Sequence, residues 1–147
     1  MRFVGREAEL KQLNQLFKKK SASLVVIRGR RRIGKSRLIS EFTKGKNSWL
    51  FSGLPPTERT TKQSQIDEFV KQMARNLKMP QLKTDNWGDV FWHLGQPARN
   101  GELVIVLDET SWMGSEDLEF LGHLKNAWDL YFSKNPDLIL IMCGSVS

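Results

Sequence analysis

The stretch of sequence that decides the fold is Leu24-Val25-Val26-Ile27-Arg28-Gly29-Arg30-Arg31-Arg32-Ile33-Gly34-Lys35-Ser36. It begins with a short apolar run, Leu24 to Arg28, which is typical of a strand buried on both faces of a sheet. The next eight residues match G-x-x-x-x-G-K-[ST], and a helical pattern follows from Lys35 to Lys44. A strand, a glycine-rich turn and a helix in this order predict a phosphate-binding loop, or P-loop.

The chemistry of this loop suits a nucleoside triphosphate. Gly29 and Gly34 permit a tight turn, whose N–H groups form an anion-binding nest at the start of a helix. Lys35 would reach the β- and γ-phosphates, and the Ser36 hydroxyl would coordinate Mg²⁺. We therefore expect ATP with magnesium as the ligand. The residues expected to hold it are Gly29, Arg30, Arg31, Arg32, Ile33, Gly34, Lys35, Ser36 and Arg37.

A second apolar run, Leu103 to Leu107, ends in two adjacent acids, Asp108 and Glu109, about 70 residues after the P-loop. Two carboxylates at the end of a buried strand are costly unless a cation lies beside them. Magnesium would meet that need, as in the Walker B motif of P-loop enzymes. We expect Asp108 to hold the metal, through water, and Glu109 to act as general base on the attacking water.

The last apolar run, Leu138 to Met142, is followed by the small residues Cys143, Gly144 and Ser145. In a parallel sheet this end of the strand lies beside the P-loop, where ligands bind. We expect Ser145 to orient the attacking water or to contact the γ-phosphate. The alternative is an ordinary turn between a strand and a loop.

Helical and strand patterns alternate along the chain. Apolar spacing predicts helices over residues 7–20, 35–44, 63–77, 87–98 and 115–132, the last of these capped by Ser115, and a further strand over 48–52. Alternating strands and helices predict an α/β fold with a mostly parallel sheet and helices on both of its faces. A chain of 147 residues is long enough for one such domain.

Charge and composition narrow the class of protein. The net charge is +7, and residues 1–50 carry 14 Lys and Arg against 3 acids. Such a basic segment attracts polyanions, but no base-reading motif accompanies it. No apolar run approaches the roughly 20 residues that span a bilayer. A single cysteine, Cys143, allows no internal disulfide, and the cytoplasm is the expected compartment.

Other candidate sites have weaker support. His93 and His123 lie on separate predicted helices without a Cys or His partner at metal-ligand spacing. Ser111 has no His-Asp arrangement around it that would make it a nucleophile. The five tryptophans are expected mainly in the core rather than stacked on bases.

These motifs, in this order, resemble the AAA-like STAND-type P-loop ATPases of archaea and bacteria. The resemblance covers the N-terminal half of their nucleotide-binding core and essentially all of this chain. Its elements are the opening Phe3-Val4-Gly5-Arg6-Glu7-Ala8-Glu9-Leu10, the arginine-rich P-loop, Trp87 opening a helix, the Asp108-Glu109 strand, Ala127-Trp128-Asp129 and Cys143-Gly144-Ser145.

The resemblance implies a three-layer ASCE-type core with strand order 5-1-4-3-2. It implies that Ser145 is the sensor-1 residue and that an adenine pocket is lined by Phe3, Val4, Gly5 and Arg6. The chain departs from the family pattern because the fifth strand, the helical lid, the winged helix, the effector domain and any arginine finger are missing. Thr110 also stands where a larger apolar residue is common. We therefore expect residues 1–147 to be a truncated P-loop domain.

The favoured interpretation is an ATP-binding and potentially ATP-hydrolysing switch core. A non-catalytic nucleotide-binding fragment, a small-molecule kinase and a basic nucleic-acid-associated ATPase fragment stay open as alternatives. The chain has no Asn-Lys-x-Asp motif, which argues against a GTPase. With the fifth strand missing, the apolar first strand has an open edge, and this edge predicts self-association. No membrane partner is expected.

Overall fold

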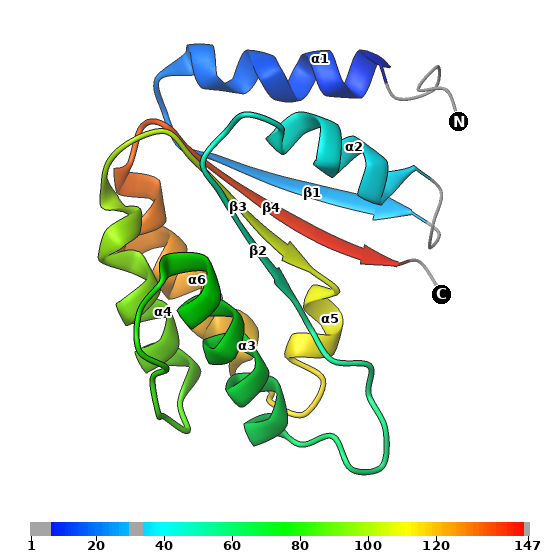
Figure 1. The fold of residues 1–147 in the computed structure, drawn as a ribbon, viewed down its shortest axis with the longest axis vertical. Helices are drawn as coiled ribbons and strands as arrows, with labels where there is room; N and C mark the ends of the chain where they lie inside the picture. The colour runs from blue at the N-terminus through cyan, green and yellow to red at the C-terminus, as the bar shows by residue number, and fades with distance from the viewer. Residues whose placement is uncertain (1–6, 30–33, 146–147) are drawn as a thin grey trace.

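The computed structural model describes residues 7–29 and 34–145, which form a single parallel sheet with helices on both of its faces (Figure 1). The strands are β1 (Ser23–Gly29), β2 (Ser48–Ser52), β3 (Leu103–Asp108) and β4 (Leu138–Ser145). The α-helices are α1 (Glu7–Leu16), α2 (Lys35–Thr43), α3 (Lys62–Leu77), α4 (Trp87–Gly95), α5 (Thr110–Met113) and α6 (Phe120–Leu130). Three 3₁₀ turns complete the elements: η2 (Phe17–Lys19), η3 (Pro97–Arg99) and η4 (Phe132–Lys134).

The strand order is β1-β4-β3-β2, with every neighbouring pair parallel. This confirms the predicted α/β class and the 1-4-3-2 part of the predicted strand order. The carboxyl ends of all four strands therefore lie at one edge of the sheet, on the right in Figure 1. Gly29, Asp108 and Ser145 each occupy the last position of a strand at that edge.

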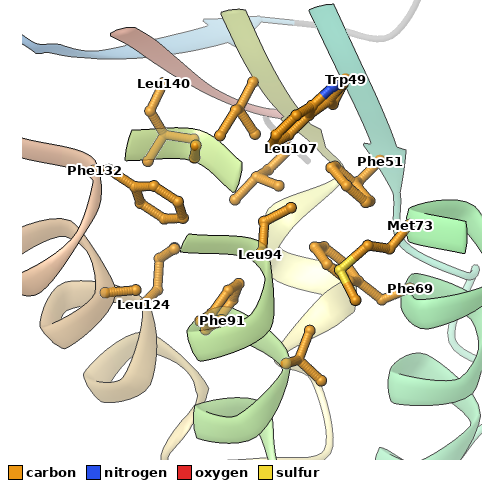
Figure 2. Close-up of a cluster of buried hydrophobic side chains, with 14 of the residues drawn as sticks. Trp49, Phe51, Phe69, Met73, Phe91, Leu94, Leu107, Leu124, Phe132 and Leu140 are labelled. Atoms are coloured by element: carbon orange, nitrogen blue, oxygen red, sulfur yellow. The ribbon is translucent and has the colours of Figure 1, made fainter. Parts of the chain in front are cut away.

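Alternating side chains of the two central strands enter two apolar clusters. Leu103, Ile105 and Leu107 of β3 face a large cluster under α3, α4 and α6, and Figure 2 shows Leu107, Leu94 and Phe91 among its side chains. Val104 and Val106 face a smaller cluster under α1 and α2. Burial on both faces explains why β3 is a continuous apolar run, as expected for an interior parallel strand.

The predicted helix over residues 115–132 is confirmed over Phe120–Leu130, but its predicted start and its Ser115 cap are wrong. The segment after β3 forms the short helix α5, a turn, and then α6 from Phe120. The hydroxyl of Ser115 does not cap a helix but donates to the Trp112 carbonyl at 2.8 Å. Gly114 ends α5 against the Phe120 ring, where an added Cβ would lie 2.7 Å from the ring. The helix thus starts later than predicted, and its first residue, Phe120, packs in the large cluster.

The prediction that β1 is buried on both faces is also wrong. Val25 and Ile27 pack in the small cluster, but Leu24 and Val26 are 47% and 53% exposed on the opposite face. α3, α4 and α6 cover the other strands on that face, and in the described residues no helix lies over β1 there (Figure 1). Two predicted helices also end earlier, since residues 17–19 and 97–99 form 3₁₀ turns rather than helix ends.

Candidate functional site

The described end of the P-loop opens helix α2. Gly34 has a φ of 74°, a conformation that glycine adopts without strain, and its carbonyl accepts from the Leu38 N–H at 2.9 Å. Lys35 is the first residue of α2, followed by the exposed Ser36 and Arg37. The remaining predicted phosphate-binding residues, Arg30 to Ile33, lie outside the described residues, as do Phe3 to Arg6 of the predicted adenine pocket.

Lys35 points to the end of β3. Its side chain is only 6% exposed, and its Nζ lies 3.3 Å from Asp108 Oδ1 and 3.7 Å from Glu109 Oε1. The P-loop lysine and the two predicted Walker B acids, more than 70 residues apart in the sequence, thus form one cluster of charges. The pairing is the compensation that two carboxylates at the end of a buried strand require.

Asp108 and Glu109 differ in exposure and in backbone conformation. The Asp108 side chain is 36% exposed, and its Oδ1 also accepts from the Glu109 N–H at 2.9 Å. Glu109 is buried and has a φ of 55° and a ψ of 51°. This left-handed conformation costs a residue other than glycine on the order of 1 to 3 kcal/mol, so it persists only where the surroundings hold it.

The site also offers oxygen ligands for a cation. Two carboxylates lie beside the ammonium group of Lys35. No group of three or more His, Cys, Asp or Glu side chains within residues 7–29 and 34–145 could hold a metal alone. Asp108 and the Ser36 hydroxyl offer the oxygen ligands that magnesium prefers, and phosphate oxygens commonly complete such a site. The donor set therefore fits magnesium bound together with a nucleotide.

Ser145 ends β4 in register with Gly29, the first residue of the P-loop. This backbone position places it at the edge of the sheet that also carries Asp108, although only the backbone of Ser145 is described. Its predicted role as sensor-1 stays a prediction.

Sequence reasoning missed the contacts by which two residues fix the turn after β3. The Thr110 hydroxyl lies 2.9 Å from the Leu107 carbonyl and 3.2 Å from the Cys143 carbonyl. Gly53 donates its N–H to the Asp108 carbonyl at 3.1 Å, and an added Cβ there would lie 2.8 Å from the Glu109 carbonyl. Thr110 departs from the family pattern, and that departure was the one available signal. The contacts themselves depend on which strands are neighbours.

Cys143 lies beside the same charges but is not a nucleophile. The pKa of its thiol is raised to about 12, mainly by burial and also by the negative charges of Asp108 and Glu109, while Lys35 lowers it. The thiol is therefore protonated at neutral pH. His93 and His123 stay apart from this site, because His93 Nδ1 lies 2.8 Å from the Asp89 carbonyl and His123 Nε2 lies 3.9 Å from Glu119.

Comparison with known proteins agrees with this geometry. The family model for the AAA ATPase domain matches residues 2–133. The chain belongs to this family. The family consists of nucleotide-binding ATPases, which is what the P-loop and the acidic end of β3 indicate. Within residues 7–29 and 34–145, none of the AAA domain's helices is both long and apolar enough to cross a membrane.

The individual relatives are distant or uncharacterised. MJECL04, an uncharacterised protein of Methanocaldococcus jannaschii, is 22% identical over 145 residues, which are 99% of this chain and 30% of that protein. MJ0423, an uncharacterised ATP-binding protein of the same organism, is 41% identical over 44 residues, which are 30% of this chain and 75% of that protein. The AAA domain thus spans less than a third of the length of MJECL04.

A solved structure shares the fold. The ORC2 protein of Aeropyrum pernix, determined in ADPNP and ADP complexes, superposes with a TM-score of 0.64 at 16% identity. The superposition covers 95% of this chain and 41% of that one. At this level of identity the likeness concerns the fold alone.

Proposed function

We propose that residues 1–147 form a P-loop domain that binds ATP with magnesium and hydrolyses it slowly. The observation that carries this proposal is the contact of the buried Lys35 ammonium with both Asp108 and Glu109. ATP hydrolysis needs a lysine that can move to the phosphates, one acid that binds the metal and one acid that binds the attacking water. Lys35, Asp108 and Glu109 supply these three groups. The arginine-rich P-loop supports placing the domain among the STAND-type ATPases.

In this proposal each side chain has one task. Lys35 leaves the carboxylates and binds the β- and γ-phosphates, where a charge-assisted contact is strongest. Ser36 and Asp108 hold the magnesium ion, which when bound neutralises charge on the phosphates. Glu109 accepts the proton of the attacking water, and Ser145 orients that water.

Arg30, Arg31 and Arg32 are proposed to contribute to phosphate binding, and Phe3 to Arg6 are proposed to contact adenine. Both proposals rest on the family resemblance alone.

Nucleic-acid binding is a second candidate function for the whole protein. It is favoured by the exposed Lys18, Lys19 and Lys20, which leave a basic surface at the end of α1. A steep loss of DNA affinity with rising salt would support it.

Replacing Glu109 by Gln tests the hydrolytic part of the proposal. A general base contributes about 10² to 10⁴ to a rate, so Glu109→Gln should lower single-turnover hydrolysis at least about 100-fold and change Mg-ATP affinity little. The measurement follows radiolabelled ATP with protein in excess, so that a single slow turnover can be detected.

Glu102→Gln is the matched control, since Glu102 is exposed just before the opposite end of β3. It should leave the rate unchanged. Equal rates in wild type and Glu109→Gln would overturn the hydrolytic role and leave a nucleotide-binding domain without this catalytic base.

A further inference from the structure

The sheet divides at the edge where the candidate site lies. The pairing of β3 with β4 ends at Leu107 opposite Met142, whereas the pairing of β1 with β4 continues to Gly29 opposite Ser145. The pairing of β3 with β4 therefore stops three residues before β4 ends, although β3 stays paired with β2 as far as Asp108 opposite Ser52. The turn that carries Glu109 lies beyond this division, without backbone pairing to β4.

Thr110 spans the division with its side chain. Its buried hydroxyl lies 2.9 Å from the carbonyl of Leu107, the last paired residue of β3. It also lies 3.2 Å from the carbonyl of Cys143, the residue of β4 that follows the last pair. Both partners are acceptors, so the single hydroxyl proton is shared between them in a three-centre hydrogen bond. The Thr110 side chain thus continues the link between β3 and β4 where the backbone ladder stops.

The turn is held from its other side by β2 and the loop that follows it. Gly53 donates its N–H to the Asp108 carbonyl, and its lack of a side chain admits the Glu109 carbonyl. The Glu109 carbonyl in turn accepts from the N–H groups of Trp112 and Met113, at 3.0 and 3.3 Å. Glu109 keeps its left-handed backbone between these two supports, and the Thr110 hydroxyl is the support on the side of Ser145.

We propose that Thr110 is a positioning residue for ATP hydrolysis. Its hydroxyl sets the Glu109 carboxylate at a fixed place relative to the strand that ends in Ser145. This inference rests on the proposed function, because it assigns the task of Thr110 through Glu109. Thr110 does not touch the nucleotide and takes no part in binding it.

Valine replaces threonine with nearly the same shape but without the donor, so Thr110→Val removes only the shared hydrogen bond. It should lower single-turnover hydrolysis about tenfold while the Kd for Mg-ATP stays within about twofold of wild type. Thr110→Ser keeps the hydroxyl and should keep the rate within about threefold. Thr43→Val is the matched control, because the Thr43 hydroxyl also bonds a carbonyl, that of Ile39 at 2.8 Å, at the far end of α2.

A double-mutant cycle separates positioning from a general loss of stability. If Thr110 acts through Glu109, Thr110→Val should cause no further loss of rate in a Glu109→Gln background. A multiplied loss in the double mutant would overturn the proposal. So would a Thr110→Ser variant as slow as Thr110→Val, because the hydroxyl would then not be the cause.

A second readout does not depend on turnover. Amide hydrogen exchange of Gly53, Trp112 and Met113, whose N–H groups bond to the turn, should be faster in Thr110→Val than in wild type and in Thr110→Ser. If the domain hydrolyses no ATP at all, the proposed hydrolysis fails, yet faster exchange would still support positioning of the Glu109 turn. Unchanged exchange at all three amides would overturn it.

Discussion

The two edges of the sheet are built differently. The outer backbone groups of β2 and of the loop after it are bonded by amide side chains of α3. Gln72 Nε2 and Oε1 bond Ser52 O and N at 3.1 and 2.8 Å, Asn76 Nδ2 donates to Leu50 O at 2.9 Å, and Gln65 bonds both backbone groups of Leu54 at 2.9 Å. Three side chains on one face of α3 thus bond two residues of the edge strand β2, Leu50 and Ser52, and one residue of the loop after it, Leu54.

At the other edge, β1 presents exposed apolar side chains instead. Leu24 and Val26 are about half exposed, and along β1 the described residues show no comparable row of amides. A groove of about 380 Å³ runs between α1 and this edge, with Leu13 and Leu16 in its wall. Edge strands are protected in natural sheets because an open edge pairs with other chains. The comparison shows that the amide side chains of α3 close the β2 edge, whereas a further strand can pair with the β1 edge.

The largest expected effect is on the alkylation rate of Cys143, which tests whether β1 separates from β4. Cys143 lies opposite Ile27 of β1, so its thiol reports separation of β1 from β4. Because its pKa is raised from 9.0 to about 12, alkylation at pH 8 should be at least about thirtyfold slower than that of a free thiol, since the smaller thiolate fraction outweighs the greater nucleophilicity of that thiolate. Labelling at the free-thiol rate would mean that the β1 edge opens readily.

The same pKa shift predicts how stability depends on pH. A thiol whose pKa is higher in the folded state stabilises the fold fully below pH 9.0, and this contribution is lost as pH rises towards 12. The free energy of unfolding should therefore fall over this alkaline range, and the loss should be smaller in Cys143→Ala, provided that this variant folds.

The next effect in size is self-association through β1. Val26→Lys places a charge beside the open edge and should weaken association at least about tenfold in light scattering across a concentration series. Leu50→Lys is the matched control, because Leu50 is 49% exposed on the edge strand that α3 protects. Equal weakening by both substitutions, or a monomer at every concentration, would show that the two edges do not differ as proposed.

The smallest effect is expected from removing one amide at the protected edge. Gln72→Ala leaves the Ser52 N–H and carbonyl without their side-chain partner and should lower the free energy of unfolding by about 1 to 2 kcal/mol. Urea denaturation measures it, with the exposed Lys71→Ala of the same helix as control. A loss no larger than that of the control would mean that water replaces the Gln72 amide at no cost.

The sequence predicted the local elements of the site better than the contacts between them. The strand before Gly29, the helix that opens at Lys35 and the apolar run before Asp108 are confirmed, because each depends on a local pattern of apolar residues. The strand order came from the family resemblance, and its 1-4-3-2 part is confirmed.

The sequence-based predictions that failed concern features that depend on tertiary packing. The helix predicted to follow Ser115 begins only at Phe120, which packs against Gly114, and no local pattern indicates this contact. The exposure of Leu24 and Val26 depends on which helices cross the sheet. The shared hydrogen bond of Thr110 joins residues 33 positions apart, so it appears only once β3 and β4 are neighbours.

The most direct test of the central claim is the affinity of Lys35→Ala for Mg-ATP, measured by titration calorimetry. The claim is that the Lys35 ammonium, held by Asp108 and Glu109 in the structure, binds phosphate when a nucleotide is present. Charge-assisted contacts of this kind contribute about 3 kcal/mol, so the Kd should rise at least about 100-fold, while the exposed Lys11→Ala changes nothing. A Lys35→Ala variant that keeps the wild-type circular dichroism spectrum and binds Mg-ATP within a few-fold of wild type would contradict the account.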